Sequence, residues 1–252
     1  MQKTVQEIKE VQVIYDFDDT IVETNSEFEA TNEQCAEIIV GEVSGTSEMV
    51  KEVLAFQRKL DVEMVRTHGF IPPRYLMSWQ ATYEHFVKEA GKDVSEEVNE
   101  RIKETVQDLY IRQYKNIPGS VETMEQLKKE GYSMIILTAG QDEIQKRKVR
   151  ESGAIAFVED VIVYPRKTPE TLKEVMALYP AKQYVMIGNS LKSDIHPALE
   201  NDAWGFHFER QTWEADHHDI DRDHEKYVHI SSPDQIPQKL KQILEVTRPV
   251  AV

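Results

Sequence analysis

Residues 11–20 read Val11-Gln12-Val13-Ile14-Tyr15-Asp16-Phe17-Asp18-Asp19-Thr20. The first five are rich in β-forming residues and predict a buried strand, and the acidic residues come where that strand ends. Asp16 and Asp18 are two residues apart, so both carboxylates leave the strand in the same direction. Their mutual repulsion favours a bound divalent cation, and a carboxylate can also act as a nucleophile.

Downstream of residue 115, strand and helix patterns alternate. The sequence predicts strands over 133–137, 158–163, 184–188, 204–208 and 227–230 and helices over 121–130, 169–178, 195–200 and 236–246. Alternation of this kind predicts an α/β fold with a doubly wound parallel sheet and helices on both faces.

Residues 25–114 show a different pattern, without a convincing strand. Apolar residues recur at spacings of three and four, which predicts four helices. Ser95 begins the last of them, and Pro72-Pro73 opens the third. The second carries an apolar stripe of Met49, Val53, Phe56, Leu60 and Met64. We therefore expect a core domain of residues 1–22 and 116–252, interrupted by a helical domain of residues 23–115.

Composition excludes several classes of protein. The chain has 252 residues, and its 30 Lys and Arg against 45 Asp and Glu leave a formal charge of −15. An acidic surface argues against nucleic acid and anionic membranes as partners, and an anionic substrate would need local cations. The single cysteine, Cys35, rules out an internal disulfide. There is no apolar membrane segment or signal peptide, so we expect a cytoplasmic protein.

Polar groups follow several of the predicted strands. Thr138 ends the second strand, Lys167 follows the third, and Asn189-Ser190 ends the fourth with Asp194 just beyond. In open α/β sheets, ligands bind at the carboxyl ends of the strands. A hydroxyl and an ammonium near two carboxylates would hold phosphoryl oxygens and offset their charge.

These motifs together resemble those of haloacid dehalogenase-superfamily phosphatases. Asp16-Phe17-Asp18-Asp19-Thr20 is similar to the first motif, and Leu137-Thr138-Ala139-Gly140 is similar to the second. Lys167 resembles the third, and Gly188-Asn189-Ser190-Leu191-Lys192-Ser193-Asp194 resembles the fourth. The motifs occur in the family's order and span positions 16 to 194.

The resemblance implies a role for each matching position. Asp16 would be the nucleophile and Asp18 the general acid/base. Thr138 and the amide of Ala139 would hold the phosphate, and Lys167 would neutralise charge. The implied Mg²⁺ ligands are Asp16, the backbone carbonyl of Asp18, Asn189 and Asp194. The helical insert would be the mobile cap that closes over the substrate.

The resemblance also suggests a function. Relatives that displace halide lack the second carboxylate, so Asp18 favours Mg²⁺-dependent hydrolysis of a small phosphorylated metabolite through a phospho-aspartate. Asn189 departs from the Asp of many relatives and removes one negative charge. Alternatives are a phosphomutase or phosphotransferase with the same motifs, a non-catalytic ligand-binding relative, and a receiver domain, which would lack both Asp18 and a cap.

Other polar features have plainer interpretations. We expect Asp19 to form a turn, Cys35 to pack in the cap, and the histidine-rich stretch 216–229 to be a solvated loop. Trp79 and Tyr83 are expected in the core of the cap. The segment 66–74 is either a substrate-contacting loop or a plain helix connection. Neither the physiological substrate nor the oligomeric state follows from the sequence.

Overall fold

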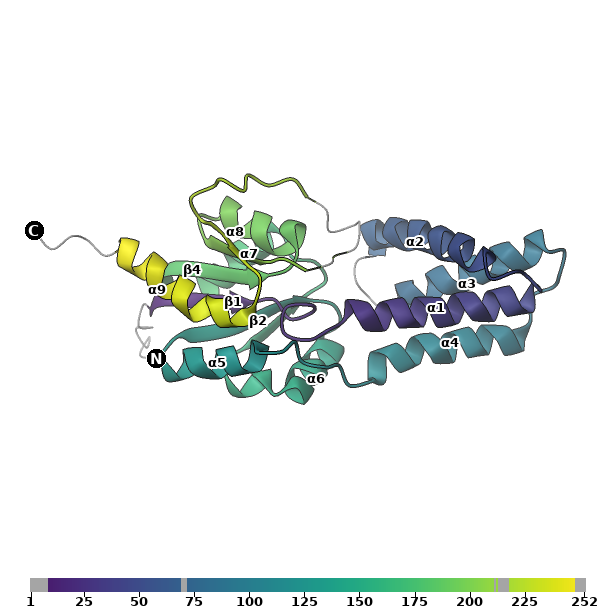
Figure 1. Cartoon of the computed structure of the whole chain (residues 1–252), viewed down its shortest axis with the longest axis horizontal. Helices are drawn as coiled ribbons and strands as arrows, with labels where there is room; N and C mark the ends of the chain where they lie inside the picture. The colour runs from purple at the N-terminus through teal and green to yellow at the C-terminus, as the bar shows by residue number, and fades with distance from the viewer. Residues whose placement is uncertain (1–8, 69–71, 211, 213–217, 248–252) are drawn as a thin grey trace, which may run out of the picture.

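The computed structural model describes residues 9–68, 72–210, 212 and 218–247 (Figure 1). Its core is a six-stranded sheet in the order β3-β2-β1-β4-β5-β6, with every neighbouring pair parallel. The strands are β1 (Lys9–Tyr15), β2 (Ser133–Ala139), β3 (Val161–Tyr164), β4 (Ala181–Gly188), β5 (Trp204–Phe208) and β6 (Tyr227–Ile230). The predicted doubly wound α/β fold is confirmed.

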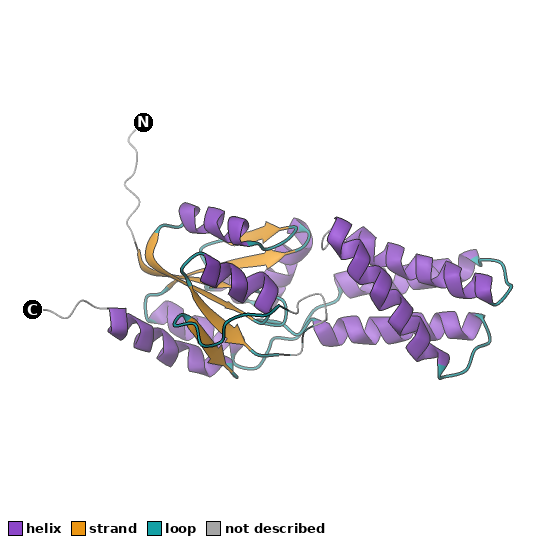
Figure 2. Cartoon of the chain, turned by 90° about the horizontal axis from the view of Figure 1, so that it is seen from above, coloured by secondary structure: helices purple, strands orange, loops and turns teal. Residues whose placement is uncertain are grey.

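Helices cover both faces of this sheet (Figure 2). Successive side chains of a strand point to opposite faces, so β1 packs on both sides. Val13 and Tyr15 belong to the larger apolar core, and Ile14 belongs to a second one. The larger core takes in α5 (Ser120–Lys129), α6 (Asp142–Ser152) and α9 (Ile236–Thr247), and the second takes in α7 (Pro169–Leu178) and α8 (His196–Glu200).

Four long helices form a bundle at one end of the sheet domain (Figure 1). They are α1 (Asn25–Glu42), α2 (Met49–His68), α3 (Pro72–Glu89) and α4 (Glu96–Ile111). The predicted starts are confirmed: α3 begins at Pro72, and the Ser95 hydroxyl accepts the backbone N–H of Val98 at the start of α4. The two connections to the core lie together, because Val22 forms bridges with both Asp18 and Asn116. The domain boundaries at 22/23 and 115/116 stay a prediction.

Three local predictions need correction. The buried face of α2 is Val53, Gln57, Asp61 and Val65, whereas Phe56, Leu60 and Met64 are only partly buried. The face is turned because Asp61 pairs with Arg74 and Gln57 bonds to Ser78, contacts that an apolar pattern does not reveal. The strand predicted over 158–163 occupies Val161–Tyr164, and a π-helical turn at Leu191–Ile195 precedes α8.

The packing of the cap agrees with the sequence. Trp79, Tyr83 and Cys35 are all fully buried. Burial raises the pKa of the Cys35 thiol to about 12, so this side chain is a packing residue rather than a reactive thiolate. Among the described residues, no helix is long and apolar enough to cross a membrane.

Truncating Trp79 tests the cap core. Trp79→Ala should lower the free energy of unfolding by about 3–5 kcal/mol, because it leaves a large cavity between the helices. Met77 lies on the same helix and is 46% exposed, so Met77→Ala should stay within about 0.5 kcal/mol of the wild type. Urea titration followed by circular dichroism measures both, and equal losses would contradict the assignment.

Candidate active site

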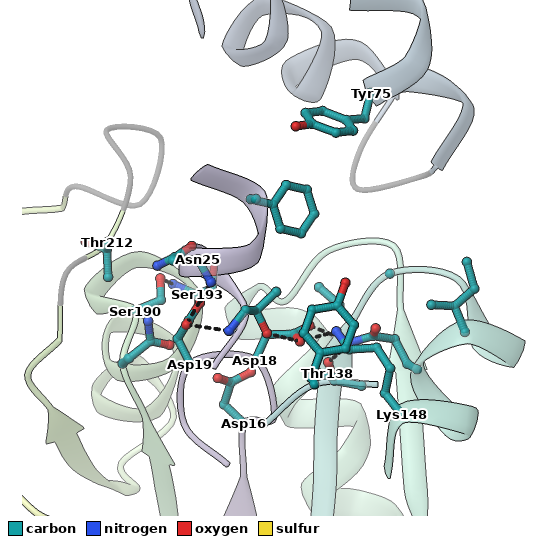
Figure 3. A pocket seen from close by; sticks show the side chains of 18 of the residues that line it. Asp16, Asp18, Asp19, Asn25, Tyr75, Thr138, Lys148, Ser190, Ser193 and Thr212 are labelled. Carbon is teal, nitrogen blue, oxygen red and sulfur yellow. Dashed lines mark hydrogen bonds and ion pairs between the residues drawn. The ribbon is translucent and has the colours of Figure 1, made fainter. Parts of the chain in front are cut away.

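All seven predicted site residues line a single cavity between the sheet and the cap (Figure 3). Asp16 and Asp18 follow β1, and Lys167 follows β3. The remaining four are Thr138 and Ala139 at the end of β2 and Asn189 and Asp194 after β4. They meet because the carboxyl ends of parallel strands lie at one edge of the sheet.

The Lys167 ammonium lies between two carboxylates. Its Nζ contacts Oδ1 of Asp16 and Oδ1 of Asp194, and all three side chains are at most 5% exposed. Burial alone would lower the pKa of Lys167, but the two carboxylates raise it well above its usual value. The pKa of Asp16 is raised by burial and by repulsion from Asp194, which outweigh the attraction of Lys167. One ammonium group thus forms ion pairs with two buried carboxylates.

Neighbouring groups hold these two carboxylates in place. The Thr20 hydroxyl donates to Oδ2 of Asp16 at 2.7 Å, and the backbone N–H of Ser190 donates to Oδ2 of Asp194 at 3.0 Å. Gly188 leaves the space that the Asp194 carboxylate fills, because a Cβ at position 188 would overlap it. The last residue of β4 therefore has to lack a side chain.

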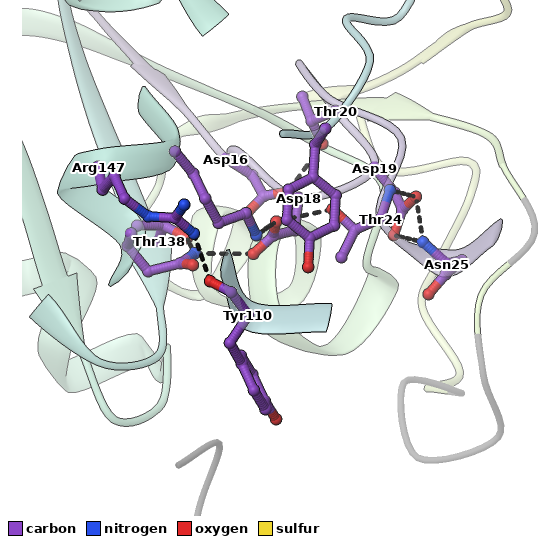
Figure 4. A network of polar contacts seen from close by, with 12 residues as sticks. Asp16, Asp18, Asp19, Thr20, Thr24, Asn25, Tyr110, Thr138 and Arg147 are labelled. Atoms are coloured by element: carbon purple, nitrogen blue, oxygen red, sulfur yellow. Dashed lines mark hydrogen bonds and ion pairs between the residues drawn. The ribbon is translucent and has the colours of Figure 1, made fainter. Parts of the chain in front are cut away.

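Asp18 has a separate set of partners (Figure 4). Thr24 donates to its Oδ1 at 2.7 Å, Gln145 donates to its Oδ2 at 2.7 Å, and Lys148 forms an ion pair with it. Burial alone would raise the pKa of Asp18, but Lys148, Thr24 and Gln145 lower it. The Lys148 Nζ also lies 4.4 Å from the centre of the Tyr114 ring. In this arrangement Asp18 is held as a carboxylate.

Gln145 and Lys148 were not predicted from the sequence. Gln145 also donates to the Thr138 hydroxyl at 2.6 Å, so it links the second motif to Asp18. Both residues are buried on α6, whose sequence is polar on most sides. Only their spacing of three, which places them on one helical face, could have indicated a shared role. The sequence does not show which face of α6 turns toward the cavity.

Asp19 has a structural role, as expected. Its backbone is left-handed, with φ of 57°, and its carboxylate accepts the backbone N–H groups of Thr24 at 2.9 Å and Asn25 at 3.0 Å. Burial raises the pKa of Asp19 to about 6 despite these two donors. The residue therefore turns the chain sharply after the first motif and caps the start of α1.

The donor set around Asp16 suits a hard cation. Asp16, Asp194 and Asn189 offer side-chain oxygens at the cavity, and the Asp18 carbonyl is expected to add a backbone oxygen. Oxygen ligands of this kind fit Mg²⁺. Within the described ranges, no three His, Cys, Asp or Glu side chains form a metal-binding group. A metal site here would use two carboxylates supplemented by neutral oxygens, and no histidine is among the described residues that line the cavity.

The histidine-rich stretch lies partly outside the described residues, which exclude Asp216 and His217. His218 lies near His196, with ring centres 4.3 Å apart, and His229 bonds to Glu209 at 2.9 Å. The described histidines thus have separate partners. That the stretch 216–229 is a solvated loop stays a prediction.

Two arginines of the core contact the carboxyl ends of cap helices. Arg147 on α6 donates to the carbonyls of Tyr110 and, at 2.7 Å, Ile111 at the end of α4. Arg166 donates to the carbonyls of Val65 and, at 2.6 Å, Arg66 near the end of α2. These carbonyls carry the negative end of the helix dipole and attract a cation. Arg166 directly precedes Lys167, so this contact with the cap lies next to the ion pairs of Lys167.

One family of known proteins matches the part of the chain that contains all four motifs. The family model of haloacid dehalogenase-like hydrolases matches residues 12–201. The chain belongs to the haloacid dehalogenase-like hydrolases. None of the curated proteins matches the sequence. The family match confirms the superfamily that the four motifs indicated.

Solved structures with a similar fold include a dehalogenase and a predicted phosphatase. A haloacid dehalogenase-like family hydrolase from Xanthomonas campestris has a TM-score of 0.75 at 22% identity, covering 94% of this chain and 97% of that one. A 2-haloacid dehalogenase from Pseudomonas syringae has a TM-score of 0.57 at 19% identity, covering 94% and 100%. A predicted phosphoglycolate phosphatase from Haemophilus somnus has a TM-score of 0.59 at 14% identity, covering 94% and 99%. At these identities the likeness shows the shared fold.

Adding a methyl group at position 188 tests the packing of Asp194. Gly188→Ala should displace its carboxylate from Lys167 and lower the free energy of unfolding by at least about 2 kcal/mol, because a buried ion pair is disturbed. Gly41 lies on α1 with open space around it, so Gly41→Ala should be neutral or slightly stabilising. Urea denaturation measures both, and a neutral Gly188→Ala would show that the loop after β4 adapts freely.

Removing the two bridging arginines tests the attachment of the cap. The double variant Arg147→Ala with Arg166→Ala should open the hydrolase and increase its radius of gyration in small-angle X-ray scattering, because both helix ends lose their cations. Arg150 is exposed on the same helix as Arg147, so Arg150→Ala is the matched control and should scatter like the wild type. An unchanged double variant would mean that other contacts hold the cap.

Proposed function

We propose that this hydrolase cleaves the phosphate ester of a small phosphorylated metabolite through a phospho-aspartate intermediate. The observation that carries the proposal is the second carboxylate, Asp18, which lines the same cavity as Asp16 and is hydrogen-bonded through Gln145 to Thr138. Displacement of halide by a carboxylate needs no group to protonate the leaving atom. A phosphate ester has an alcohol leaving group, which does need one.

The proposed reaction has two steps. An oxygen of Asp16 attacks phosphorus, the ester oxygen leaves with a proton from Asp18, and the phosphoryl group is held by Thr138 and Lys167. A water molecule then gives its proton to Asp18 and attacks the phosphoryl group, which releases phosphate and restores Asp16. Lys148, Thr24 and Gln145 hold Asp18 as the base that this second step requires. The first step uses a proton on Asp18, which is the proton that the water molecule of the previous turnover gave to it.

Charge also supports the proposal. Asp16 and Asp194 share one cation, so a phosphate dianion would meet a site with too little positive charge. Bound Mg²⁺ would supply that charge and neutralise oxygens of the transferred group. The residues that would hold it are Asp16, Asp18 through its carbonyl, Asn189 and Asp194. The neutral amide of Asn189 leaves Asp16 and Asp194 as the charged ligands.

Activity of the nucleophile variant tests the proposal. Phosphate release from para-nitrophenyl phosphate and a panel of metabolite phosphates should require Mg²⁺ and stop with EDTA. Asp16→Asn should lower kcat by at least about a thousandfold, because the intermediate cannot form. Asp93→Asn, an exposed aspartate in the turn between α3 and α4, is the control and should keep full activity.

Two further measurements separate the alternatives. Wild-type protein quenched in acid during turnover should carry phosphate that hydroxylamine removes, as expected for an acyl phosphate. A phosphomutase would instead transfer its phosphate to a second hydroxyl of the product. The fold is shared with a 2-haloacid dehalogenase from Pseudomonas syringae, so dehalogenase chemistry is the alternative to test. Halide release from 2-chloropropionate without phosphate release from any ester would refute the phosphatase proposal.

A further inference from the structure

The cavity extends well beyond the catalytic carboxylates. Its volume is about 320 Å³, and its lining continues from Asp16 and Asp18 up to residues of α1, α2, α3 and α4. Figure 3 shows Tyr75 of the cap above the catalytic groups, on the far side of this space. A phosphoryl group held by Thr138 and Lys167 would occupy only the sheet end of the cavity. The cap end is therefore available to the rest of the substrate.

Three aromatic rings from three helices gather at the cap end. Phe28 of α1, Tyr75 of α3 and Tyr110 of α4 all line the cavity. The Phe28 ring lies edge-on to both tyrosines, at 5.2 Å from Tyr75 and 6.4 Å from Tyr110, and the two tyrosines are 6.4 Å apart. Edge-to-face packing is a favourable arrangement of aromatic rings, and it holds these three together at the wall of the cavity.

Two of the three rings keep accessible surface. Phe28 and Tyr110 are partly buried, whereas Tyr75 is 2% exposed and its hydroxyl donates to Asn32 at 2.6 Å. Rings that serve only as cap core behave differently: Trp79 and Tyr83 are fully buried and do not line the cavity. Phe28 and Tyr110 therefore offer apolar surface to whatever enters, and Tyr75 packs against both of them.

Charges at the cap end cancel. Among the described residues, the ionisable cap groups that line the cavity, apart from tyrosines, are two cations, Arg58 and Arg74, and two anions, Glu29 and Asp61. Arg74 is 95% buried and forms an ion pair with Asp61, so its charge is already balanced. An acidic leaving group would find no net positive charge there. An uncharged leaving group would lose little hydration free energy on moving from water into the cavity.

We propose that the leaving group is an uncharged alcohol that carries a flat ring, and that this ring packs against Phe28 and Tyr110. The inference rests on the proposed phosphatase function and names its substrate class. The phosphate end is held by the strand ends, and the ring end is held by the cap. Closure of the cap would then bring both ends of the substrate to their sites together.

Matched substrates test the ring preference without changing the chemistry of the bond broken. Benzyl, cyclohexylmethyl and ethyl phosphate all release a primary alcohol of similar acidity. In the presence of Mg²⁺, kcat/KM should be at least about tenfold higher for benzyl than for ethyl phosphate, since extra apolar contact in a pocket gives selectivity of this size. Cyclohexylmethyl phosphate should lie between them, because its ring is bulky but not flat. 2-Phosphoglycolate should be no better than ethyl phosphate.

Variants of the two ring residues assign the preference to the cap. The readout is the ratio of kcat/KM for benzyl to that for ethyl phosphate. Phe28→Ala and Tyr110→Leu should each lower this ratio at least about threefold, which matches the loss of one aromatic contact. Phe28→Leu keeps the apolar volume and gives the same test if Phe28→Ala fails to fold.

Phe56 provides the matched control. It lies on α2, is partly buried like Phe28, and stacks on His85 at 4.1 Å outside the cavity lining. Phe56→Leu should keep the wild-type ratio.

The outcomes separate the two proposals. If no phosphate ester is hydrolysed, the proposed function fails. If ethyl phosphate is hydrolysed as fast as benzyl phosphate, if 2-phosphoglycolate is preferred, or if the ratio does not change in the Phe28 and Tyr110 variants, the phosphatase stands and the ring inference is overturned. A ratio that falls equally in Phe56→Leu would also overturn it, because the effect would then be general to the cap.

Discussion

The Lys167 ammonium holds together the two buried carboxylates on which the site is built. Asp16 directly follows β1 and Asp194 lies in the turn after the neighbouring strand β4, and without a shared cation their repulsion would separate these segments. Removing one partner of such a buried group leaves an uncompensated charge, which is far more costly than losing a surface ion pair. The arrangement also explains two local features, the absence of a side chain at Gly188 and the hydroxyl of Thr20 against Asp16. The first gives the Asp194 carboxylate its space, and the second holds the Asp16 carboxylate by a hydrogen bond.

Helix α6 connects Asp18 and Thr138 to the cap. Within four residues it supplies Gln145, which bonds to both Thr138 and Asp18, and Lys148, which pairs with Asp18. Between them, Arg147 holds the end of α4. A movement of the cap that pulls on Arg147 therefore acts on the same helical turn that positions Asp18. This physical link would let the position of the cap influence Asp18, the proposed acid/base group, and it complements the Arg166 contact beside Lys167.

Sequence patterns predicted the parallel sheet well because each strand is a short apolar run followed by polar groups. The runs at Val11–Tyr15 and Trp204–Phe208 are strands in the structure, and the start of α4 at Ser95 has its own hydrogen-bond signature. The prediction was wrong where side chains pair over long range. Asp61 and Gln57 turn the buried face of α2 away from its apolar stripe, because their partners Arg74 and Ser78 lie on another helix. Periodicity describes one helix at a time and does not detect such pairs.

The sequence by itself determined the order of the motifs, and with it the placement of Asp16, Thr138, Lys167 and Asn189 at one edge of the sheet, because parallel strands bring their carboxyl ends together. Only the tertiary structure decided which other side chains complete the site. Lys148 and Gln145 enter it through the rotation of α6, and Phe28, Tyr75 and Tyr110 meet through the packing of three cap helices. Rotation and packing depend on contacts between segments far apart in the chain, and no local pattern encodes them.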